Sequence, residues 1–179
     1  MDYFQGVVTE YLRADRAMFV NTECLIQLNP ADTPAKGTHW YCDAVAANFR
    51  ETTLYLCEVT YSTTLYSLLG RLQTWSTNWR ALRAALVRDC GVPEAWQVKP
   101  WLFVPEARMA RLTNKLVMLT NVGSADGNMP APRITYLESV VPWKYRTWDR
   151  KVSALEGDTR DTATTDTPDQ AGRVDAVQR

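Results

Sequence analysis

Two acidic residues lie inside apolar stretches, where charged side chains are rare. Asp43 stands in WYCDAVA and Glu58 stands in LYLCEVTYS, and both stretches have the β-branched and aromatic composition of strands. Charged groups are almost never fully buried unless they are paired or bind a metal ion. Asp43 and Glu58 are therefore the first residues from which chemistry can be expected.

The polar sequence NFRETT separates these two stretches and favours a hairpin. A turn centred between Arg50 and Glu51 would place Asp43 directly opposite Glu58, with their Cβ atoms about 5 Å apart. Carboxylates at that separation repel each other unless a cation lies between them. We therefore predict either a bound divalent ion or a structural salt bridge to a basic residue such as Arg71.

Glu10 and Thr60 extend this candidate site. Glu10 flanks the apolar stripe of a helix predicted over residues 3–19, from which its carboxylate could reach the strands. Thr60 shares a face with Glu58 because side chains alternate along a strand. Three carboxylates offering only oxygen suit Mg²⁺ or Mn²⁺ better than zinc. Such an ion can activate a bound water and neutralise charge on a phosphodiester.

The composition predicts a soluble protein of one domain. The chain has 179 residues, of which 46% are hydrophobic and 22% are charged. Its 20 basic residues equal its 20 acidic ones, so no strong overall field favours nucleic acid or a membrane. Its apolar stretches are too short to span a bilayer, and residues 1–20 carry charges that a secretory leader would not tolerate. We expect a cytoplasmic protein without a membrane partner.

The cysteines and the histidine give little support to other chemistry. None of the four cysteines forms a C-x-x-C pair, and His39 is the one histidine. A closed zinc site and a Ser/His or Cys/His hydrolase are therefore disfavoured.

Periodicity predicts the order helix, three strands, helix, strand, helix. The helices are expected over residues 3–19, from Leu65 to near Gly91, and over 107–119; the strands over 22–29, 39–49, 52–62, 96–106 and, further along, 134–141. This order predicts an α/β fold with a single mixed β-sheet flanked by helices. Residues 1–150 would form this domain, and residues 151–179, rich in Asp and Thr, a disordered acidic tail.

Glu10 in a first helix, Asp43 in a second strand and Glu58-Val59-Thr60 ending a third resemble the motif of the PD-(D/E)XK nuclease superfamily, which includes the restriction endonucleases. The resemblance covers residues 3–105 and implies an α-β-β-β-α-β restriction endonuclease-like core. It implies hydrolysis of phosphodiester bonds in DNA with Mg²⁺ or Mn²⁺, held by Asp43 and Glu58 and completed by Glu10.

The chain departs from the family motif at Thr60, where the family has a lysine that orients the attacking water. A threonine hydroxyl can hydrogen-bond a water but brings no positive charge. Arg71, on the helix after the motif, is the candidate to supply that charge, although an arginine hardly acts as a base. The expected catalytic residues are Glu10, Asp43, Glu58, Thr60 and Arg71.

Two other interpretations stay open. The domain could have lost cleavage and serve as a DNA-binding or protein-interaction subunit. Alternatively, it is a small α/β domain whose acids form ordinary salt bridges, since ion-pair networks commonly mimic active sites.

Two basic segments could contact phosphates. Arg108, Arg111 and Lys115 recur on one helical face, and Lys144 and Arg146 alternate with aromatic residues in PWKYRTWDRK. Basic helix faces are also often merely solvated. DNA is the expected partner, RNA is not distinguished from it by the sequence, and a protein partner or a homodimer is the further alternative.

Overall fold

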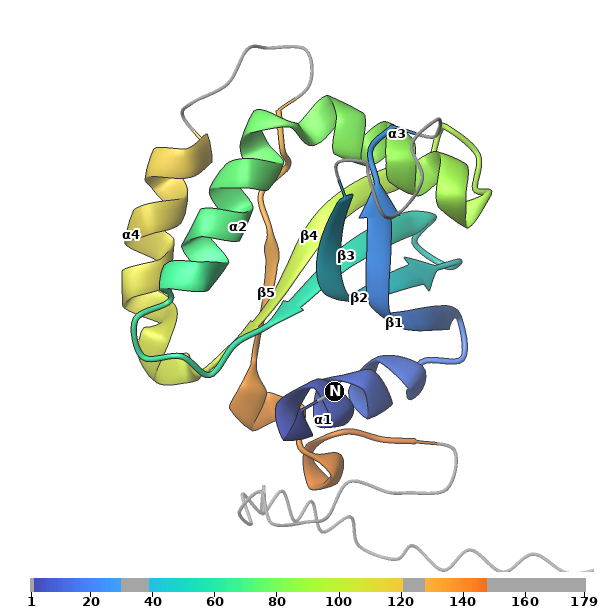
Figure 1. Ribbon diagram of the computed structural model, residues 1–179. Coiled ribbons are helices and arrows are strands. Elements are labelled where there is room, and N and C mark those ends of the chain that lie inside the picture. Colours follow the sequence, from blue (N-terminus) through green and yellow to red (C-terminus); the bar gives the residue numbers. More distant parts are fainter. Residues whose placement is uncertain (1, 30–38, 121–127, 148–179) are drawn as a thin grey trace, which may run out of the picture.

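A computed structural model describes residues 2–29, 39–120 and 128–147, which form one sheet with helices on both faces (Figure 1). The strands are β1 (Met18–Gln27), β2 (His39–Asn48), β3 (Thr53–Val59), β4 (Gln97–Val104) and β5 (Arg133–Tyr136). The helices are α1 (Tyr3–Arg13), α2 (Tyr66–Thr77), α3 (Trp79–Cys90) and α4 (Met109–Thr120), with short 3₁₀ helices η1 (Glu106–Arg108), η2 (Leu137–Ser139) and η3 (Pro142–Lys144). The acidic tail predicted over residues 151–179 lies outside the described residues.

The sheet is mixed, as the sequence predicts. Its strands lie in the order β1-β2-β3-β4-β5. β2 is antiparallel to both β1 and β3, whereas β3, β4 and β5 run parallel to one another. The α/β class is thereby confirmed. β3 lies at the centre of the sheet, and the carboxyl ends of β3 and β4 meet at one edge.

Two apolar clusters hold the layers together. The major cluster lies between the sheet and α2, α3 and α4, and the minor cluster lies between the sheet and α1 (Figure 1). β3 supplies both, because Leu54 and Leu56 face the major cluster while Tyr55 and Cys57 face the minor one. A central strand covered on both faces is therefore apolar throughout, and an acid in it stands out.

The helix predicted over residues 3–19 ends earlier, at Arg13. Asp15 organises a turn directly after it. Its carboxylate accepts a hydrogen bond from the backbone N of Ala17 at 3.0 Å, and its carbonyl accepts one from the backbone N of Met18 at 2.9 Å. Short acidic side chains compete for backbone donors in this way. As a result, β1 begins earlier than the sequence predicts.

The single helix predicted from Leu65 to near Gly91 is two helices. α2 and α3 are separated at Asn78, whose φ of −116° is not helical. The Asn78 side chain donates to the carbonyl of Thr74 at 2.9 Å and so covers an acceptor at the end of α2. The apolar stripe nevertheless continues into the major cluster across the break. The last predicted strand is also shorter, because the chain enters η2 after Tyr136.

No helix within residues 2–29, 39–120 and 128–147 is both long enough and apolar enough to cross a membrane.

Two glycines allow a matched test of the helices. Gly91 ends α3 with φ +63°, so Gly91→Ala should lower the free energy of unfolding by about 1 kcal/mol. Gly70 lies inside α2, and a Cβ there would meet nothing within 4 Å. Gly70→Ala should therefore raise the free energy of unfolding by about 0.5–1 kcal/mol. Urea unfolding measures both, and the same sign for the two variants would contradict this assignment of helix ends.

Candidate functional site

The hairpin of β2 and β3 aligns the two acidic residues. Ala44 pairs with Cys57, Val45 with Leu56, and the register continues to the turn centred between residues 50 and 51. This alignment is the one that the sequence predicts. The ladder ends at the pair Ala44–Cys57, and the next residues along the two strands, Asp43 and Glu58, lie close enough for the charge of Asp43 to raise the pKa of Glu58.

Asp43 is held by two hydrogen bonds. Its Oδ2 accepts from the backbone N of Val59 at 2.7 Å, and its Oδ1 accepts from Nε2 of Gln5 at 2.7 Å. The first bond ties β2 to the end of β3, and the second ties the sheet to α1. Asp43 is only half-buried, so its carboxylate retains lone pairs that a cation could use.

Glu58 is 4% exposed, and its two carboxylate oxygens have different surroundings. Oε2 forms an ion pair with Nη1 of Arg71. Oε1 is buried and has no hydrogen-bond partner among the described residues. Burial raises the pKa of Glu58 to about 8; the hydrogen bond from Arg71 opposes this, and the negative charge of Asp43 adds to it. Keeping the Glu58 side chain charged at this buried position costs free energy unless a further group binds Oε1.

The side chains of β2 change from one face of the sheet to the other next to Asp43. Ala44 packs in the minor cluster, but Cys42, two residues before it, packs in the major cluster. On the neighbouring strand, Glu23 has a φ of +54° and directly precedes Cys24, the partner of Cys42. Residues two apart on a regular strand share a face, so both strands bend here. The bend places the Asp43 carboxylate where α1 and β3 can both reach it.

α1 contributes Gln5 to this site, and the structure does not bring Glu10 there. Glu10 is exposed and forms an ion pair with Arg13 at 3.3 Å. Gln5 both accepts a bond from the backbone N of Asp2 at 2.8 Å and donates to Asp43. The spacing of Asp2 and Gln5 is a capping-box signal, which could have marked Gln5 in the sequence but not its contact with Asp43.

The site therefore has two carboxylates where the sequence predicts three. Across the described parts of the chain, no group of three or more His, Cys, Asp and Glu side chains is placed to hold a metal ion. Asp43 and Glu58 supply the carboxylate oxygens of the site, and Gln5 presents the Nε2 of its amide to Asp43.

Thr60 directly follows β3, the strand that carries Glu58, and Arg71 reaches Glu58 from α2. Thr60 follows β3, where its backbone N donates to the carbonyl of Phe103 at 3.0 Å and its hydroxyl accepts from the backbone N of Ser62 at 3.2 Å. Arg71 projects from α2 with 38% of its side chain exposed. It lines an open cavity of about 470 Å³ that also involves Tyr41 and Trp75. Arg71 thus lies between this cavity and Glu58.

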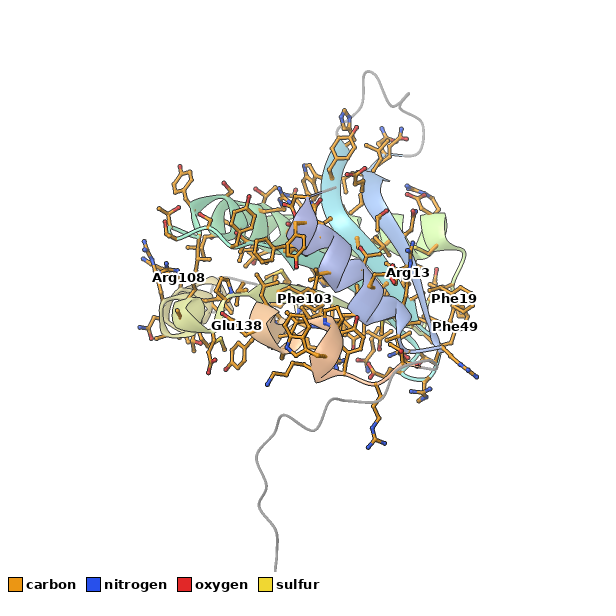
Figure 2. All side chains as sticks on the ribbon, turned by 90° about the horizontal axis from the view of Figure 1, so that it is seen from below. Arg13, Phe19, Phe49, Phe103, Arg108 and Glu138 are labelled. Atoms are coloured by element: carbon orange, nitrogen blue, oxygen red, sulfur yellow. The ribbon has the colours of Figure 1, made fainter. Side chains whose placement is uncertain are left out.

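The predicted phosphate-contacting residues divide between the two ends of the sheet. Arg108 follows β4, so it lies at the same end as Glu58, and Arg111 and Lys115 continue from it along α4. Figure 2 shows Arg108 at the opposite end of the molecule from Phe49, which adjoins the β2–β3 turn. Arg146 lines a separate cavity beside Glu51, in that turn.

Lys144 belongs to η3, which follows η2 on the α1 side of the sheet. The hydrogen bonds and ion pairs described above join Asp43 and Glu58 to Gln5, Val59 and Arg71, and not to Lys144 or Arg146.

Comparison with known proteins gives no match to a family model and no similar protein among those with curated functions.

Proposed function

We propose that this chain is a Mg²⁺- or Mn²⁺-dependent phosphodiesterase that acts on DNA. The observation that carries the proposal is Oε1 of Glu58, a buried carboxylate oxygen with no hydrogen-bond partner among the described residues, in a side chain close enough to Asp43 to feel its charge. A hard divalent cation would satisfy this oxygen and remove the repulsion between the two acids. Mg²⁺ commonly uses one or two carboxylates and keeps several waters, so two protein carboxylates are sufficient.

The order of the elements supports a restriction endonuclease-like core. One helix precedes three antiparallel strands, two helices follow, and β4 then joins the sheet parallel to β3. The paired acids lie in the second and third strands, where the PD-(D/E)XK motif has them. This support concerns topology, and the activity depends on the side chains.

Each side chain would have a distinct role. Asp43 and Glu58 would hold the ion, and Gln5 would fix the orientation of Asp43. The bound ion would supply an activated water and neutralise charge on the phosphate. The Thr60 hydroxyl would hydrogen-bond the water, and the guanidinium of Arg71 would stabilise negative charge on the phosphate. Glu10 has no role in this arrangement.

A second candidate function is DNA or protein binding without cleavage. It is favoured by the ion pair of Arg71 with Glu58, which already supplies a cation to the site, together with threonine at the position of the family lysine. In that case the carboxylates would be a structural remnant.

Cleavage of labelled DNA tests the proposal. Duplex, single-stranded and branched DNA, with RNA alongside, would be incubated with the protein in Mg²⁺, Mn²⁺, Ca²⁺ or EDTA. We expect weak cleavage with Mn²⁺ and none with EDTA. Absence of cleavage of every substrate with both Mn²⁺ and Mg²⁺ would reject the phosphodiesterase and leave the binding function.

A further inference from the structure

Four exposed tyrosines adjoin the residues of the candidate site. Their exposed fractions are 74% for Tyr3, 59% for Tyr41, 57% for Tyr61 and 82% for Tyr66. They come from α1, β2, the segment after β3, and α2. Large side chains are normally exposed singly, so four of one kind on the segments that supply the site need an explanation. We call these four residues the tyrosine rim.

One half of the rim lies where α1 meets the end of β3. The ring of Phe4 lies 5.4 Å from the ring of Tyr3 and 4.9 Å from the ring of Tyr61. Phe4 directly precedes Gln5, which bonds Asp43, and Tyr61 directly follows Thr60. Tyr3, Phe4 and Tyr61 therefore form one aromatic cluster on the two segments that supply Gln5 and Thr60.

The other half lies where β2 meets α2. Tyr41 is in edge contact with His39 at 5.7 Å, and both line the 470 Å³ cavity together with Arg71. Tyr66 directly precedes Ser67, which also lines this cavity. Arg71 connects this half of the rim to the site, because it lines the cavity and also pairs with Glu58.

The cavity offers a donor to an anionic ligand through Arg71. Arg71 lines the cavity with 38% of its side chain exposed, and its guanidinium can donate but not accept hydrogen bonds. It therefore suits an acceptor such as a phosphate oxygen.

The chemistry of the rim favours unpaired bases. A tyrosine side chain tolerates water and offers a flat π face on which a base can stack. In a duplex the faces of the bases are already stacked on neighbouring bases, whereas in a single strand they are available. Stacking on aromatic side chains, combined with phosphate contacts by cations, is how proteins bind single strands without reading their sequence.

We propose that the tyrosine rim binds a single-stranded segment of nucleic acid and directs it across the Asp43–Glu58 pair. This inference rests on the proposed function for what happens at the carboxylates, but binding by the rim can be measured without cleavage. Its substrate is then a single strand, or the unpaired end of a duplex, and not an intact double helix.

Binding without cleavage is the first test. Fluorescence anisotropy in EDTA would give the Kd for a labelled oligonucleotide of about 16 nucleotides, as single-stranded DNA, as RNA and as a blunt duplex. We expect the single strand to bind more tightly than the duplex. Tyr61→Ala and Tyr41→Ala should each raise the Kd for the single strand by about 10-fold, and together by about 100-fold. The DNA and RNA arms decide which polynucleotide is preferred.

Two variants serve as controls. Phe19 is 65% exposed and packs edge-on against Phe49 at the other end of the sheet, so Phe19→Ala should leave the Kd unchanged. Tyr61→Leu keeps an apolar side chain without a ring and should weaken binding as much as Tyr61→Ala. Tyr61→Trp should retain binding, and its emission should be quenched by the single strand.

The possible outcomes separate this inference from the proposed function. Equal Kd values for Tyr61→Leu, the double alanine variant and the unaltered protein would overturn the rim, even if the protein cleaves DNA. Tighter binding of the blunt duplex than of the single strand, or no binding of any of the three oligonucleotides, would overturn it as well. Tyrosine-dependent binding of a single strand by a protein that cleaves nothing would support the rim and reject the phosphodiesterase.

Discussion

Glu58→Gln is expected to abolish Mn²⁺-dependent cleavage and, in EDTA, to make the protein more stable at pH 8. Glutamine keeps the shape of the side chain and an oxygen for Arg71, but it cannot supply a negative oxygen to a cation. It also removes the cost of charging a buried carboxyl group. Loss of function with gain of stability is typical of a residue kept for its chemistry.

The direction of the pH effect follows from the pKa of Glu58, which burial raises from an ordinary 4.5 to about 8. Between these values the folded protein binds the proton more tightly than the unfolded chain does. The free energy of unfolding should therefore fall as the pH rises from 5 to 8, by on the order of 3 kcal/mol. In Glu58→Gln this contribution is absent, and the curve should be flatter over the same interval.

Urea unfolding at several pH values in EDTA measures this, and cleavage of the best DNA substrate measures activity. Glu10→Gln is the matched control, because it removes an exposed carboxylate from α1, and neither activity nor the pH profile should change. Asp43→Asn should also abolish cleavage and Mn²⁺ binding by calorimetric titration. Unchanged Mn²⁺ binding by Asp43→Asn would mean that the two acids do not share an ion.

Arg71→Ala is expected to lower cleavage by about 10²–10³-fold, the effect of losing one donor that stabilises charge in a transition state. Among the ion pairs of the described residues, Arg71 is the cation that pairs with Glu58. It also lines the adjoining cavity. Thr60→Lys in this background should restore part of the rate, because it places a charge where the family has its lysine. Thr60→Lys alone should retain or increase cleavage.

Two measurements make this result interpretable. Arg71→Lys keeps a positive charge near Glu58, so it should lose less activity than Arg71→Ala and little stability. Mn²⁺ binding to each variant by calorimetric titration separates loss of the ion from loss of phosphate stabilisation. Full activity in Arg71→Ala would show that Arg71 does not replace the lysine. Absence of cleavage by the unaltered protein, Arg71→Ala, Thr60→Lys and the double variant would favour the binding function.

The hairpin was the most predictable part of the site. A polar turn between two strands fixes the register, and the observed register of β2 and β3 is the predicted one, so a local pattern was sufficient to bring both acids to the same end of the hairpin. The pairing of Arg71 with Glu58 also followed from a simple consideration, since a buried acid needs a cation. Both inferences used residues close together in the sequence.

The contribution of α1 could not be predicted in the same way. Periodicity identifies which face of a helix is apolar, but it does not determine where along the strands the helix is seated. Gln5 and Glu10 are both compatible with reaching the sheet, and the packing of α1 selected Gln5. The strand bend at Glu23 was also hidden, because a positive φ at glutamate has no sequence signal comparable to glycine.

One amide group joins the first turn of α1 to the carboxylate of Asp43. Gln5 accepts from Asp2 through Oε1 and donates to Asp43 through Nε2, so these two bonds share a single side chain. Helix ends fray on timescales much shorter than that of global unfolding. Each opening of this turn that carries Gln5 away leaves Asp43 with the bond from the backbone N of Val59 alone. The breathing of a helix end, which elsewhere has no effect on a remote site, thus sets how much of the time this carboxylate keeps both of its hydrogen bonds.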